Sequence, residues 1–135
     1  MIMNNFGKVI VSLATAVVAA AIAYAIKKML EANSMVIPQS AVKHKDELTL
    51  EDLVMYFKQL SLDKALDTPF VSKDLPKYGV ELPEPPKNGE NVLLVGVFEE
   101  QRNVLKHYLL VYSKKYDEAL QNVLAKAKDG IITLS

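Results

Sequence analysis

The stretch that decides the fold reads Val92-Leu-Leu-Val-Gly-Val-Phe98. Its unbroken apolar run has the length of a β-strand and is typical of a central strand covered on both faces. A polar connection, Glu99–Asn103, joins it to Val104–Tyr112, which is rich in β-branched and aromatic residues. Together these runs predict a β-hairpin. One long helix over residues 97–129 is the alternative, because that range lacks Gly and Pro and has apolar residues at helical spacing.

A helix and a closing strand are predicted downstream of the hairpin. Ser113 is placed to cap a helix that Asp129-Gly130 ends, and Ile131–Leu134 is the strand. The apolar stripe of this helix comprises Tyr116, Ala119, Leu120, Val123, Leu124 and Ala127. A right-handed crossover would set the last strand parallel to Val104–Tyr112, on the far side of Val92–Phe98. The predicted sheet therefore has three strands in the order 2-1-3.

Upstream of the hairpin, Thr49 is placed to cap a helix, with Glu51 and Asp52 in its first turn. Residues 49–135 are thus predicted as one small α+β domain of order α-β-β-α-β. Five of the six prolines fall in residues 67–91, so this segment is expected to be a strap packed on the domain or a site read by a partner. Residues 34–48 are predicted as a linker, since Pro38 breaks any helix there. The expected core comprises Leu53, Phe57, Leu94, Val95, Val97, Leu109, Val111, Leu120, Leu124 and Ile132.

Residues 1–33 are predicted to hold a membrane-spanning helix, at residues 9–26, with its flanks. The segment has no charge, Gly or Pro and spans about 27 Å as a helix, close to the roughly 30 Å of a bilayer core. The residues expected to mark the span are Val9, Ile10, Val17, Val18, Ile22 and Ile26. The small residues Ser12, Ala16 and Ala20 have the spacing of a helix-packing face. Lysines after the span place the C-terminal domain in the cytoplasm.

Two other interpretations of the N-terminal segment stay open. Ala23-Tyr-Ala25 resembles a signal-peptide cleavage site, so cleavage after Ala25 would release a secreted or surface-held binding domain. The segment could also be a buried helix of a soluble protein, although it has no polar face.

Composition and motifs argue against an enzyme and against a nucleic-acid partner. The chain has 16 basic and 16 acidic residues, whereas phosphate-backbone binding needs a positive surface. It has no cysteine and no glycine-rich phosphate loop. His44, between two lysines, is expected to be solvated, and His107 to be a surface residue of a strand. No catalytic residue, cofactor or metal site is predicted.

The predicted topology is similar to that of the ring-building modules of bacterial secretion and sporulation complexes. It is also similar to ferredoxin-like domains that lack or shorten their first strand. We therefore expect a single-pass membrane protein that acts as a non-enzymatic interaction or assembly subunit, whose partners are the lipid bilayer and other proteins, including a second copy of itself. The uncharged last strand is the predicted edge where a partner adds a strand, through Ile131, Ile132, Thr133 and Leu134.

Overall fold

The computed structural model describes residues 16–63, 65–127 and 130–134, which form an α+β fold around a five-stranded mixed sheet. The strand order is β1-β4-β3-β2-β5. The strands are β1 (Val42–Leu48), β2 (Asp67–Ser72), β3 (Asn91–Glu99), β4 (Val104–Tyr116) and β5 (Ile131–Thr133). The helices are α2 (Ala16–Asn33), α3 (Leu50–Gln59) and α4 (Glu118–Leu124), with short 3-10 turns at Gln39–Ala41 and Leu75–Tyr78.

The predicted hairpin is confirmed, and the alternative of one helix over residues 97–129 is wrong. β3 and β4 pair antiparallel, with Leu94 opposite Leu110 and a bulge between Val97 and Phe98. Most of β3 is buried on both faces, as its continuous apolar run predicts. These two strands form the centre of the sheet, and the others are added on either side of them.

The sheet is larger than the predicted three strands because two segments without a clear strand pattern also pair. The proline-rich segment supplies β2, which lies between β3 and β5. Pro69 is tolerated there because it lies at the end of the pairing with β5, where its carbonyl accepts a bond from the Leu134 N–H at 2.8 Å. The expected linker supplies β1, which pairs parallel with β4. β1 is an edge strand of mainly exposed polar residues. Its sequence therefore lacks the alternation of apolar and polar residues by which a strand is recognised.

The predicted direction of the last strand is also wrong. β5 is antiparallel to β2, and β2 is antiparallel to β3, so β5 runs opposite to β4. β2 takes the place beside β3 that the last strand was expected to fill, so β5 pairs antiparallel with β2 instead. α4 has only seven residues. This helix is short because β4 extends to Tyr116, alongside β1. Asp117 rather than Ser113 then caps α4, its side chain accepting a bond from the Leu120 N–H.

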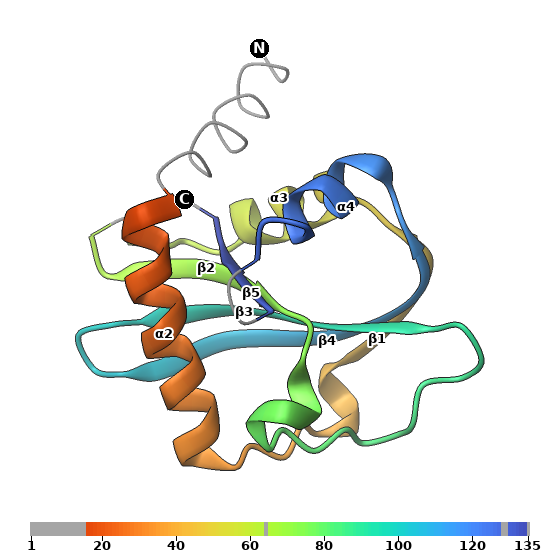
Figure 1. Cartoon of the computed structure of the whole chain (residues 1–135), viewed down its shortest axis with the longest axis horizontal. Coiled ribbons are helices and arrows are strands. Elements are labelled where there is room, and N and C mark those ends of the chain that lie inside the picture. Colours follow the sequence, from red (N-terminus) through yellow and green to blue (C-terminus); the bar gives the residue numbers. More distant parts are fainter. Residues whose placement is uncertain (1–15, 64, 128–129, 135) are drawn as a thin grey trace.

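Helices cover both faces of the sheet (Figure 1). α3 and α4 pack on one face, around Val71, Val95 and Val111. α2 packs on the other face, where Ile26 and Leu30 are completely buried. The predicted core residues are all buried except Leu109, which is partly exposed beside α3.

The packing of α2 corrects the prediction of a membrane-spanning helix. Ile26, Met29 and Leu30 contact the same buried cluster as Phe70 and Leu110 of the sheet, so this half of the segment is a core helix. Among the residues that the structure describes, no helix has both the length and the apolar character needed to cross a bilayer. The single-pass membrane assignment, and the placing of the domain on one side of a bilayer, are therefore not supported.

The individual residues of the predicted span fall into three groups. Ile22 and Ile26 belong to the α2 cluster on the sheet. Val17 and Val18, and the proposed helix-packing residues Ala16 and Ala20, lie in the first turns of α2. Val9, Ile10 and Ser12 lie outside the described residues. α2 also continues without a break through Ala25 and Ile26, the position at which signal cleavage was the alternative.

Candidate functional site

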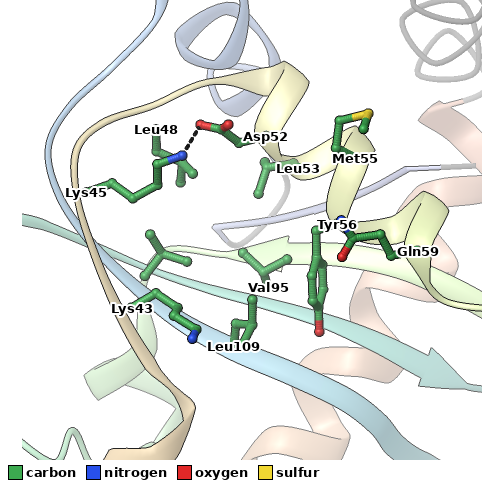
Figure 2. A pocket seen from close by; sticks show the side chains of 11 residues that line it. Lys43, Lys45, Leu48, Asp52, Leu53, Met55, Tyr56, Gln59, Val95 and Leu109 are labelled. Carbon is green, nitrogen blue, oxygen red and sulfur yellow. Dashed lines mark ion pairs between the residues drawn. The ribbon is translucent and has the colours of Figure 1, made fainter.

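A groove of about 270 Å³ lies on the α3 face of the sheet, between α3 and strands β1 and β4 (Figure 2). Its apolar lining comprises Leu48, Leu53, Met55, Val95, Leu109 and Val111, and its more polar lining comprises Lys43, Lys45, Asp52, Tyr56 and Gln59. The groove thus combines an apolar floor with a polar rim, as ligand sites in proteins commonly do.

The position of α3 follows from the chain topology. β1 and β2 run in the same direction, since β1 is parallel to β4, and both β4 and β2 are antiparallel to β3. α3 joins them and therefore crosses over β4 and β3, which lie between them. Its start is fixed by a capping box, in which the Thr49 hydroxyl accepts from the Asp52 N–H and the Asp52 carboxylate accepts from the Thr49 N–H.

α3 buries one side and leaves another facing the groove. Leu50, Leu53, Val54 and Phe57 pack on the sheet, whereas Met55 is 51% exposed. A large exposed apolar side chain beside an apolar groove enlarges the surface that a partner could cover.

One end of the groove is closed by an ion pair. Lys45 Nζ lies 2.8 Å from Asp52 Oδ2, and Figure 2 shows this pair next to Leu48. Partial burial acts to raise the pKa of Asp52, but its bonds with Lys45 and Thr49 outweigh this effect and lower it. Asp52 is therefore ionised at neutral pH and holds Lys45 in place.

The other end of the groove has a cation without such a partner. Figure 2 shows Lys43, Leu109 and Tyr56 together at this end, away from the Lys45–Asp52 pair. No carboxylate of the described residues forms an ion pair with Lys43. Burial raises the pKa of the Tyr56 hydroxyl above its ordinary value, so this group is a neutral hydrogen-bond donor. The two side chains provide a positive charge and a donor beside an apolar floor.

Two other lysines on β4 have acidic partners on β1. Lys114 Nζ lies 3.5 Å from Asp46 Oδ1, and Lys115 Nζ lies 4.0 Å from Glu47 Oε2. Among the residues that the structure describes, Lys43 thus differs from these lysines in having no carboxylate within ion-pair distance.

The groove lies beside the first part of β4, where the described part of the chain places no strand on the outer side. β1 pairs with β4 only from Leu110 to Tyr116, whereas β4 begins at Val104. Figure 1 shows β1 alongside only this later part of β4. Within the described chain, no strand or loop forms a backbone bond to that side of residues 104–109. Their outward N–H and C=O groups are therefore available to another chain.

The two histidines have different environments. His44 does not simply face solvent: its Nε2 lies 2.7 Å from Glu84 Oε1, and its ring stacks on Tyr112 at 5.2 Å. The Tyr112 hydroxyl donates to the Glu84 carbonyl at 2.5 Å, so these residues fasten the proline-rich segment to the sheet. His107 is exposed and lies opposite Val97 on β3, as expected of a surface strand residue.

A buried carboxylate at the hairpin end of the sheet also has structural partners. Both oxygens of Asp67 lie within hydrogen-bond distance of Lys106 Nζ, at 3.0 and 3.1 Å. The Asp63 N–H donates to the same carboxylate at 2.9 Å. These bonds, that of Asp63 first, lower the pKa of Asp67. A carboxylate held ionised in this way is a structural anchor and a poor general acid.

The predicted partner edge, residues 131–134, contains β5, which is the last strand of the sheet. The bonds from Lys73 N–H to Gly130 C=O and from Leu134 N–H to Pro69 C=O imply that Ile132 bonds to β2, while Ile131 and Thr133 face outward. These two residues are nonetheless only 1% and 8% exposed. Strand addition at this edge stays a prediction, and it would require nearby parts of the protein to move.

Sequence reasoning missed the groove because its parts are far apart in the chain. Lys43 and Lys45 lie in the expected linker, and Leu109 was assigned to the core. The alternation of Lys43 and Lys45 was a weak signal that both side chains share one face of a strand.

Within the described ranges, no group of three His, Cys, Asp or Glu side chains has the arrangement of a metal site. No family model, curated protein or solved structure was found to match this chain.

Proposed function

We propose that this protein is a non-enzymatic interaction domain that binds an extended segment of another protein in the groove beneath α3. One observation carries the proposal: an apolar groove opens beside a length of β4 whose outer backbone groups have no partner in the described chain. A bound segment would pair with β4 through its backbone and place a side chain in the groove. Backbone pairing supplies affinity in this mode of recognition, and the pocket supplies specificity.

The size of the groove suits a side chain of a bound protein segment. A volume of about 270 Å³ lies close to the lower end of the range of roughly 300–1,000 Å³ that is usual for small-molecule sites. It is enough for one or two apolar side chains. Burying one such side chain stabilises a complex by about 1.5–3 kcal/mol, which is too little alone, so backbone pairing along residues 104–109 has to contribute as well.

The length of the unpaired edge sets the size of the segment. Six residues of β4, Val104 to Leu109, lie before the first residue paired with β1. At about 3.4 Å per residue they give room for a peptide of at most roughly five or six residues, because the stretch contains the bulge at Lys106 and the turn Gln39–Ala41 contacts β4. His107 on this stretch is exposed, and a polar side chain of this kind limits unspecific pairing at an edge.

The proposal can be tested by selecting peptides on the full chain. Random hexapeptides displayed on phage would be selected on the protein and, in parallel, on Leu109→Trp, which fills the groove with a larger side chain. Tyr24→Trp is the matched control, since Tyr24 lies on α2, away from the groove, and is 55% exposed. Circular dichroism would verify that each variant is folded.

We expect peptides with an apolar residue to be enriched on the wild type and on Tyr24→Trp, and to be lost on Leu109→Trp. The proposal is wrong if no peptide is enriched on the wild type. It is also wrong if a folded Leu109→Trp variant retains the same peptides with unchanged affinity.

A further inference from the structure

We infer that the segment bound in the groove is the C-terminus of its protein, running parallel to β4 with its terminal carboxylate at Lys43. This inference rests on the proposed function and adds the direction and chemistry of the ligand to it. Three features carry it: the position at which β1 begins, the charge at that position and the apolar floor next to it.

The start of β1 limits how far a peptide on this edge can extend. β1 is parallel to β4 and begins at Val42, opposite Leu110. A peptide paired with residues 104–109 would lie in line with β1 on the same side of β4. Its end nearest to β1 cannot continue along the edge, because the turn Gln39–Ala41, which contacts β4, and then β1 already occupy the next positions. An end of a chain fits there, whereas an internal segment would have to turn away.

The charge at this junction decides which end of a chain fits. A peptide parallel to β4 would bring its C-terminal carboxylate to the start of β1, and an antiparallel peptide would bring its N-terminal ammonium. Lys43 lines the groove at this point and has no carboxylate partner among the described residues. An ammonium beside Lys43 would be repelled, whereas a carboxylate would be attracted. The hydroxyl of Tyr56, at the same end of the groove, is a second donor for it.

The apolar floor of the groove beside Lys43 indicates what kind of side chain the C-terminal residue of the ligand carries. Leu109, Val95 and Val111 line the groove there without a charge of their own. A terminal residue whose backbone carboxylate meets Lys43 has its side chain next to this floor. We therefore expect Leu, Ile, Val or Phe at the C-terminal position and little preference for a charged residue.

The test compares free and blocked C-termini on the same protein. Two libraries of random hexapeptides are displayed, one with a free C-terminal carboxylate and one joined to the carrier through its C-terminus. The best binder from each is then synthesised as a fluorescent peptide, both as the acid and as the C-terminal amide. Fluorescence anisotropy gives the Kd of each form for the wild type, Lys43→Met, Lys43→Arg and Lys58→Met.

We expect the acid to bind roughly tenfold to a hundredfold more tightly than the amide, as a charge-assisted hydrogen bond would give. Lys43→Met should remove this difference, and Lys43→Arg should retain most of it. Lys58→Met should leave it intact, because Lys58 is an exposed lysine of α3 that is not part of the groove lining.

The experiment distinguishes failure of the inference about the C-terminus from failure of the proposed function. If peptides bind and Leu109→Trp abolishes binding, but acid and amide bind equally, the site reads an internal segment and the inference is overturned. Decanoate, a carboxylate with an apolar tail and no peptide backbone, is titrated in parallel. The inference is also overturned if decanoate binds as tightly as the best peptide, because the β4 edge would then add nothing.

Discussion

Replacing Ile26 with Ala tests whether α2 is a core helix. The Ile26 side chain is completely buried between α2 and the sheet, and the change removes three carbon atoms. At about 0.8 kcal/mol per buried methylene, the transfer cost is about 2.4 kcal/mol, and the cavity left behind raises it to roughly 3–4 kcal/mol. In a protein of this size the melting temperature should fall by roughly 10 °C.

The measurement is urea unfolding of the full chain followed by far-ultraviolet circular dichroism. Tyr24→Ala is the control on the same helix: Tyr24 is 55% exposed and contacts the ammonium of Lys28 over its ring, so its loss should cost under about 1 kcal/mol. A loss below about 0.5 kcal/mol for Ile26→Ala would refute the packing of α2 on the sheet, because a side chain facing lipid or solvent contributes little to the stability of the domain.

Three further predictions concern the stability of the domain. Folding lowers the pKa of Asp67 from its ordinary value of 3.8, so the ionised carboxylate stabilises the folded protein at neutral pH. This stabilisation is lost as the pH falls below 3.8, and Asp67→Asn should therefore weaken the decrease of the unfolding free energy at acidic pH. Burial raises the pKa of Tyr116 from 10.0 to about 12, so stability should fall as the pH rises through this range, and Tyr116→Phe should reduce the fall. Gly130 has φ +75°, and a Cβ there would overlap the carboxylate of Asp74, so Gly130→Ala should cost at least about 1–2 kcal/mol in urea unfolding.

Apolar patterning predicted the centre of the fold. The runs in β3 and β4 gave the hairpin, and the Thr49 cap gave the start of α3, because these signals are local. β1 could not be found in this way, since its stability comes from backbone bonds to β4 and not from apolar side chains. β2 was hidden by Pro69, which is tolerated only because of where it falls in the pairing.

The misassigned N-terminal segment shows how a buried helix can imitate a membrane span. Residues 21–30 of α2 contact the sheet on one side only, but their exposed positions include Ala21 and Tyr24 as well as Lys28. A helix whose solvent side is alanine and tyrosine has no clear polar face, so apolar content alone could not separate the two environments. The groove could not be predicted for a different reason: its position depends on where β1 begins along the edge of β4, which no local sequence pattern indicates.

Hydrogen exchange of the β4 amides tests the central claim, that a peptide adds a strand beside the groove. The measurement compares the full chain alone with the chain saturated by the best selected peptide. The amides of residues 104–109 that face outward from the sheet alternate along β4 except at the bulge beside Lys106. These amides should exchange more slowly in the complex because the peptide carbonyls accept their bonds. Amides of β5 should be unchanged. If the peptide binds and the amides of residues 104–109 exchange as fast as before, it does not add a strand to β4, and the account of the site is contradicted.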